Sequence, residues 1–144
     1  MALAARTTTD LIELVWPNSL GHPDADTIAS VAIALSIGAS RYLQIDPRNI
    51  GILDPVQNDK YWHLVFFDTH SGGAGDVLGL ASPENQRPWI EKTLSDVLII
   101  NPAHDANCAR ACNRCIQTHR TQRSAMPDRV AARDLLSAAL GGRT

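Results

Sequence analysis

The chain has 144 residues, of which 44% are hydrophobic, and a formal net charge of −2. This length suits one domain with its own core, and no apolar run approaches the roughly 20 residues that a bilayer crossing needs. The opening MALAARTTTD lacks the long apolar stretch of a secretory signal. We therefore expect a single domain over residues 1–144, located in the cytoplasm and making no membrane contact.

The small net charge conceals an uneven distribution of charge along the chain. Before Cys108 there are 13 acidic and 6 basic residues, whereas from Cys108 onward there are 2 acidic residues and 7 arginines. A basic end on an acidic body can face nucleic acid, and it can equally be the solvated face of a helix. Charge alone leaves both interpretations open.

The first third of the chain predicts a strand followed by a helix. TTTDLIELVW is rich in β-branched and apolar residues and stops at Pro17, which indicates a short strand, and residues 1–8 are expected to be flexible. With Asp26 as a candidate N-cap, DTIASVAIALSIGASRYLQI is apolar on nearly all sides. This pattern predicts a buried central helix that ends near Asp46-Pro47.

The remainder predicts a sheet and two further helices. NIGIL and YWHLVFFD read as strands separated by the polar turn DPVQNDK, and both are apolar enough to need cover from helices on at least one face. WIEKTLSDVLI and DRVAARDLLSAAL have helical periodicity. The predicted fold class is α+β: a short, mostly antiparallel sheet covered by helices, with a cysteine-rich loop and C-terminal helices.

The segment DTHSGGAG contains Asp68, His70 and Ser71, the residue types of a nucleophilic triad. Residues this close together at the end of a strand point in different directions, which argues against a local triad. The glycines could cradle a phosphate, but neither G-x-G-x-x-G nor G-x-x-x-x-G-K-[ST] is present. The segment therefore favours a tight strand-to-helix turn.

Four ring side chains are more simply explained by packing than by chemistry. His63 alternates with apolar residues inside a strand, so we expect a core histidine whose polar atoms are satisfied. Trp16, Trp62 and Trp89 lie in separate predicted elements, which is typical of core or interface anchors rather than of a base-stacking platform.

All three cysteines of the chain lie in NCARACNRCIQTHR, with the spacing C-x3-C-x2-C. A C-x-x-C pair lets two thiolates bind one metal from a tight turn, and a closed zinc site needs four ligands. His104 is the best fourth ligand, because imidazole nitrogen binds zinc well and the reach is short. The predicted metal ligands are Cys108, Cys112, Cys115 and His104, with Asp105, His119 and His70 as other candidates for the fourth position.

Two alternatives to zinc concern the same cysteines. They can be ordinary packed or redox-labile thiols without a metal. The C-x3-C-x2-C spacing also occurs in radical S-adenosylmethionine enzymes, but only 29 residues follow Cys115, too few for the barrel of those enzymes.

Four features in this order resemble the MrfA-like zinc-binding domain, or MZB domain, over about residues 8–140. They are the long apolar helix followed by YLQIDPRNIGI, the strand and turn VFFDTHSGGAGDVLGL, the knuckle CNRCIQTHRTQ, and the tail MPDRVAARDLL. In that family the domain occurs at the C-terminus of superfamily 2 DNA helicases and in DrmB-like proteins of the DISARM antiphage defence system. The family binds a structural zinc through C-x-C-x3-C-x2-C, and Ala106 stands where its first cysteine belongs.

The resemblance implies a non-catalytic zinc-binding module that works with a helicase or another defence-complex protein. Residues 104–123 form the zinc-knuckle region, and the segment after the knuckle would contact DNA or the helicase. The residues expected to make that contact are Arg110, Arg114, Arg120 and Arg123. The alternatives are a protein–protein adaptor without DNA contact and a small hydrolase using Asp68, His70 or a cysteine.

Overall fold

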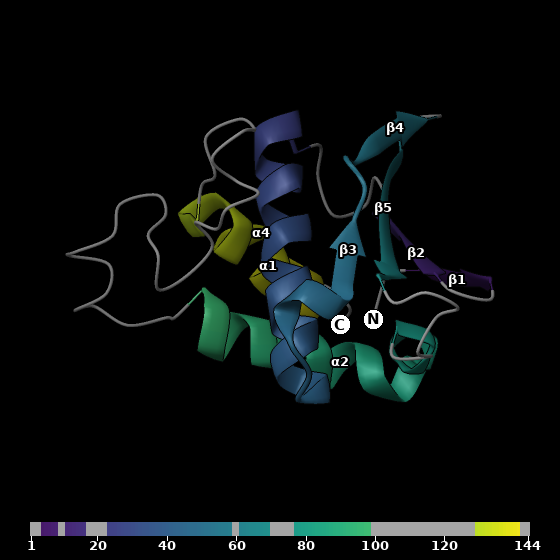
Figure 1. The fold of residues 1–144 in the computed structure, drawn as a ribbon. Coiled ribbons are helices and arrows are strands. Elements are labelled where there is room, and N and C mark those ends of the chain that lie inside the picture. The colour runs from purple at the N-terminus through teal and green to yellow at the C-terminus, as the bar shows by residue number, and fades with distance from the viewer. Residues whose placement is uncertain are drawn as a thin grey trace.

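A computed structural model describes residues 4–8, 11–16, 23–58, 61–69, 77–98 and 129–141 of the chain. It combines an antiparallel sheet with helices, which confirms the predicted α+β class. Figure 1 shows helices α1, α2 and α4 gathered on one side of the sheet. Within the described ranges, no helix is both long and apolar enough to span a bilayer.

The described residues form a sheet of five strands, in which every pair of neighbours is antiparallel. Its order is β1-β2-β5-β3, and β4 pairs with β5 beside β3. Two strands lie where the sequence predicted none: β1 is in the segment expected to be flexible, and β4 is in the segment expected to be a polar turn. The strands are β1 Ala4–Thr8, β2 Leu11–Trp16, β3 Ile50–Ile52, β4 Val56–Asn58 and β5 Tyr61–Asp68.

The alternation of burial along β2 and β5 defines two faces of the sheet. Side chains on the inner face are buried beneath α1, including Ile12, Leu14, Leu64 and Phe66. The other side chains of these strands are only partly buried, and they point away from the helices. We call this second side the outer face; β2 and β5 contribute Leu11, Glu13, Val15, Tyr61, His63, Val65 and Phe67 to it.

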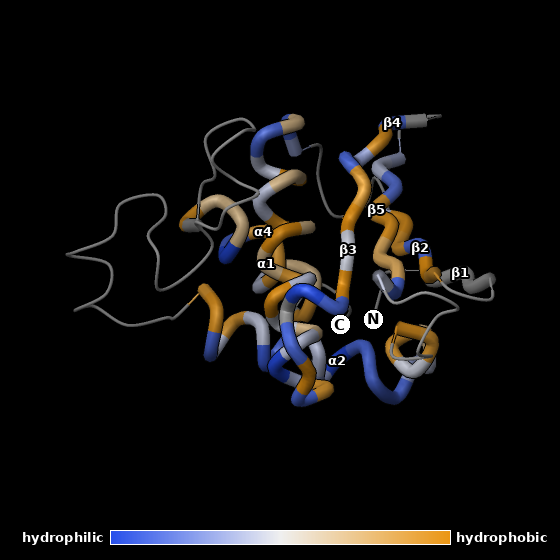
Figure 2. The backbone as a smooth tube through the Cα atoms, in the orientation of Figure 1, coloured by the Kyte–Doolittle hydropathy of each residue, from blue (hydrophilic) through white to orange (hydrophobic). Residues whose placement is uncertain are grey.

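Helix α1 (Ala25–Leu43) is the centre of the core. Its N-cap is Asp24 rather than the expected Asp26, because the Asp24 carboxylate accepts a hydrogen bond of 2.8 Å from the backbone N–H of Thr27. The helix ends at Gln44, whose φ of 59° is left-handed. Nearly every residue from 28 to 40 is buried, and Figure 2 shows hydrophobic residues along β3, β5 and the middle of α1.

A layer of further helical elements packs against α1 on the same side of the sheet. The helix predicted around Trp89 begins earlier than expected, and it continues into a π-helical turn. These elements and α4 all contact α1. The layer consists of α2 Pro83–Lys92, the π turn η4 Thr93–Val97 and α4 Arg129–Gly141; short 3-10 turns η2 Pro47–Asn49 and η3 Val77–Ala81 connect other elements.

Trp89 joins the layers of the core. Its indole N–H donates a hydrogen bond of 2.8 Å to the carbonyl of Leu35 in α1. Its ring also meets Phe66 of the sheet edge-on, with ring centroids 5.3 Å apart. Trp16 is buried as well, and Trp62 is partly buried against the core. All three tryptophans therefore lie in the core or pack against it, which confirms their prediction as core anchors.

Helix α1 and η4 approach each other closely at Gly38. A Cβ atom placed on Gly38 would lie 1.9 Å from Oγ1 of Thr93 and 3.0 Å from its Cα. Thr93 is itself buried and donates its hydroxyl to the carbonyl of Trp89 at 2.9 Å. Gly38 therefore lets α1 and η4 pack backbone against backbone.

We predict that Gly38→Ala destabilises the fold by about 1–3 kcal/mol, because the two helices must separate to admit a methyl group. Gly79→Ala is the matched control, since a Cβ there meets no heavy atom within 4 Å. Its stability should stay within about 0.5 kcal/mol of the unchanged chain. Urea unfolding monitored by circular dichroism measures both, and equal midpoints for the two variants would contradict the close contact.

Candidate functional site

The residues with the strongest chemical signal lie outside the described residues. This applies to the predicted zinc ligands Cys108, Cys112, Cys115 and His104, and to the predicted contact residues Arg110, Arg114, Arg120 and Arg123. It also applies to His70 and Ser71. Among the residues that the structure does describe, no group of three or more His, Cys, Asp or Glu side chains could hold a metal ion.

The structure places the two points from which the segment 99–128 leaves the body of the domain. On one side, Val97 and Leu98 are completely buried at the end of η4. On the other side, Ala132 and Leu136 of α4 are equally buried. Because η4 and α4 contact each other and both contact α1, the cysteine and arginine segment is attached at both ends to one helical layer.

Charged side chains surround the first of these attachment points. The ammonium of Lys92 lies 2.8 Å from the carboxylate of Asp96, and the Arg41 guanidinium donates to the Asp96 backbone carbonyl. The hydrogen bond from Lys92 lowers the pKa of Asp96 below its usual value, with smaller contributions from Ser95 and Arg41, while burial acts in the opposite direction. Arg41, Lys92 and Asp96 therefore form one polar cluster on the surface where the segment begins.

The described residues on both sides of the Gly-rich segment are also held in place. Asp68 is buried, and its carboxylate accepts a hydrogen bond of 3.3 Å from the backbone N–H of Val77. Thr69 donates its hydroxyl to the carbonyl of Arg48 at 2.7 Å and its N–H to the carbonyl of Asn49 at 3.0 Å. The Asp68 carboxylate thus has a structural role, because it holds the end of β5 to the start of η3.

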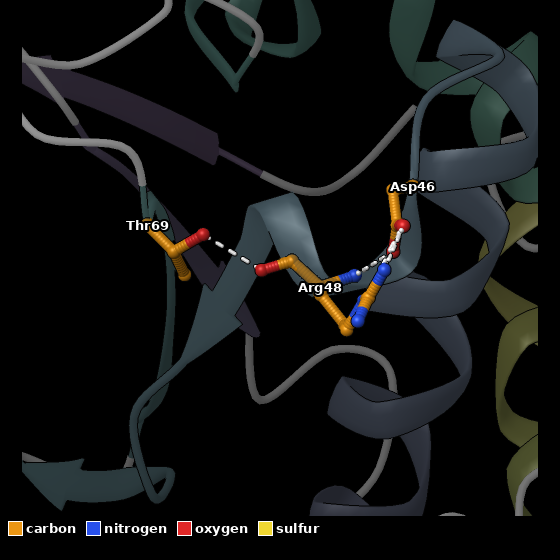
Figure 3. A network of polar contacts seen from close by, with 3 residues as sticks. All are labelled: Asp46, Arg48 and Thr69. Carbon is orange, nitrogen blue, oxygen red and sulfur yellow. Dashed lines mark hydrogen bonds and ion pairs between the residues drawn. The ribbon is translucent and has the colours of Figure 1, made fainter.

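The connection between α1 and β3 is stabilised by Asp46 and Arg48, as Figure 3 shows. The Asp46 carboxylate accepts hydrogen bonds from the backbone N–H and from the guanidinium of Arg48, each at 2.8 Å. These bonds lower the pKa of Asp46 to about 2. Sequence reasoning missed this turn, although Asp-Pro-Arg is a recognisable signal for an aspartate that binds the backbone two residues later.

His63 differs from its prediction. The expectation was a core histidine, but the ring lies on the outer face of the sheet, where its side chain is 20% exposed. Its Nδ1 is 3.0 Å from Oε2 of Glu13 on the neighbouring strand. The His63 ring therefore makes a polar contact with an acidic side chain on the outer face and does not lie in the core.

Comparisons of the chain with protein families, with curated proteins and with solved structures found no match.

We predict that Arg48→Gln raises the pKa of Asp46 from about 2 toward its ordinary value of 3.8. The rise should be partial, because the backbone N–H of residue 48 still donates to the carboxylate. Since the pKa is lowered in the folded state, the contribution of Asp46 to stability is complete above pH 3.8 and is lost as the pH falls toward 2. The carboxyl carbon shift of Asp46 in an NMR titration measures this change.

Arg87→Gln is the matched control for that titration, because Arg87 pairs with Glu91 instead. It should leave the titration of Asp46 unchanged. An Asp46 pKa that moves equally in both variants would contradict the local pair.

Proposed function

We propose that this chain is a non-catalytic zinc-binding accessory module that acts with a superfamily 2 DNA helicase in the cytoplasm, in prokaryotic antiphage defence. One observation carries the proposal: a segment with clustered cysteines and interleaved arginines is attached at both ends to a single buried helical layer. The segment after the cysteines contacts DNA or the helicase.

The donor set in this segment fits zinc by its chemistry. Three thiolate sulfurs and one imidazole nitrogen are the ligands of a common closed tetrahedral zinc site. Cys108, Cys112, Cys115 and His104 supply this set within twelve residues of sequence. Clustered cysteines in a cytoplasmic protein also favour metal binding over disulfides.

The two attachment points explain why a metal is useful here. Residues 99–128 begin at the buried Leu98 and end at α4, which is anchored by the buried Ala132. Ordering a segment of this length costs conformational entropy. Coordination of one zinc ion by four side chains would offset part of that cost within the segment itself.

The distribution of charge supports a nucleic-acid or acidic partner. Seven arginines and two acidic residues follow from Cys108 onward. Arg41 and Lys92 add two surface cations where the segment begins, although both also bind Asp96. Arginine and lysine side chains that neutralise phosphates release counterions, and this makes DNA binding sensitive to salt.

The second candidate is a protein–protein adaptor without DNA contact. It is favoured by the large apolar side chains that the domain leaves exposed near β4, including Val56 and Leu53. A hydrolase built on Asp68 receives less support, because this carboxylate is buried and holds Val77.

We predict about one zinc ion per chain in protein purified without added metal. Removal of the zinc by a chelator should lower the melting temperature, because the bound metal stabilises the closed segment. Metal analysis and thermal unfolding measure these effects. Absence of zinc together with an unchanged melting temperature would rule out the metal site.

His104→Ala and His119→Ala form a matched pair for the fourth ligand. The first should weaken zinc binding at least about tenfold, as expected when one of four ligands is lost, whereas the second should leave it unchanged. If only His119→Ala weakens zinc binding, the fourth zinc ligand is His119 and not His104.

We also predict that Arg120→Glu and Arg123→Glu weaken the binding of single-stranded or duplex DNA. Each lost phosphate contact should reduce the slope of log affinity against log salt by about 1. Fluorescence anisotropy at several salt concentrations measures both quantities.

Arg87→Glu reverses an exposed charge in α2 and is the matched control, for which no change in slope is expected. If the chain binds neither form of DNA, alone or with a helicase, yet associates with the helicase, the adaptor function replaces DNA contact.

A further inference from the structure

The last turn of η4 is a helix C-terminus whose carbonyls need donors from outside the helix. The N–H of Leu98, the C-cap residue, donates to the carbonyl of Thr93 at 3.0 Å, which is the bond of a π turn. The last four carbonyls of a helix have no N–H of their own helix within reach. The carbonyl of Asp96 is one of these, so its donor must come from another part of the molecule.

Arg41 supplies that donor from the last turn of α1. Its guanidinium donates to the carbonyl of Asp96, which lies 55 residues further along the chain. A cation at this position also complements the partial negative charge at a helix C-terminus. Because Arg41 itself lies near the end of α1, one guanidinium serves the C-terminal ends of two helices.

The bond lies about one turn beyond the close contact between the two helices. Arg41 follows Gly38 by three residues, and Asp96 follows Thr93 by three residues. The contact between Gly38 and Thr93 fixes the point at which α1 and η4 touch. A second point of attachment, at Arg41 and Asp96, then fixes the direction in which η4 ends.

The contact between Lys92 and Asp96 is of a different kind. These two residues are four positions apart on one continuous run of helix, and their side chains are 43% and 37% exposed. An exposed pair at this spacing contributes little to stability, and it cannot hold η4 to α1. Of the contacts that the structure describes for Lys92 and Asp96, only the bond from Arg41 crosses to α1.

We propose that Arg41 is a positioning residue that holds the last turn of η4 to α1, and that this turn opens separately from the core when its bond is lost. We call this bond the clasp. Opening exposes Val97 and Leu98, whose burial makes the first attachment point of residues 99–128. The clasp itself involves neither zinc nor DNA. Its importance for the cysteine and arginine segment rests on the proposed function.

Native-state amide hydrogen exchange of the full chain, followed by NMR, tests this proposal. In Arg41→Gln, the N–H of Leu98 should exchange roughly three- to tenfold faster, because opening breaks one hydrogen bond fewer. The N–H groups of α1 between residues 28 and 40 should keep their rates within about twofold, because they exchange only when the core opens. Arg41→Lys retains a charged donor and should restore part of the protection.

Two matched variants separate the clasp from its surroundings. Arg87→Gln removes an exposed arginine of α2 that pairs with Glu91 within the same helix, and it should leave the exchange of Leu98 unchanged. Lys92→Gln should raise the pKa of Asp96, because the hydrogen bond from Lys92 is the main cause of its lowered value. The exchange of Leu98 should nevertheless stay close to that of the unchanged chain.

Unchanged exchange of Leu98 in Arg41→Gln overturns the proposal. Equal acceleration of Leu98 and of α1 also overturns it, because Arg41 would then stabilise the fold as a whole. So does an acceleration in Lys92→Gln as large as that in Arg41→Gln, because the side-chain pair would then hold the turn. Measurement in excess chelator distinguishes the clasp from the proposed function: a chain without zinc contradicts that function, whereas the rate of Leu98 in Arg41→Gln still decides the clasp.

Discussion

The near-complete burial of helix α1 between residues 28 and 40 is the constraint on which the rest of the structure depends. Its residues are apolar or small on every side, so one covering surface is not enough. The helix packs against β3 and β5 of the sheet and also against α2, η4 and α4. Gly38 permits the close contact with η4, and Trp89 links α1 to the sheet through Leu35 and Phe66.

The elements that were predicted from sequence are those with strong local patterns. The apolar run of α1 and the β-branched and aromatic run of β5 identify a helix and a strand without tertiary information. Strand β4 has no such pattern, because Val-Gln-Asn becomes a strand only through pairing with residues 61–63. The N-cap was misassigned because Asp24 and Asp26 are equally good caps, and only the bond to Thr27 distinguishes them.

The proposed chemistry of the candidate site comes from the sequence, whereas the residues that anchor the segment could be identified only in the structure. The spacing of the cysteines suggests a metal, yet nothing in the sequence indicates that Leu98 and Ala132 anchor the two ends of the segment in one layer. The position of His63 was wrong for a related reason. Both faces of β5 carry apolar residues, so alternation alone does not identify the face that lies against the core.

The two-ended attachment of residues 99–128 has a consequence for how this protein can evolve. The buried residues that fix the ends, such as Val97 and Leu136, are separate from the cysteines and arginines to which we assign the proposed zinc and partner binding. Selection for folding and selection for a partner or a metal therefore act on different positions. A lineage can exchange a ligand or redistribute arginines in response to a changing partner while the core sequence stays the same.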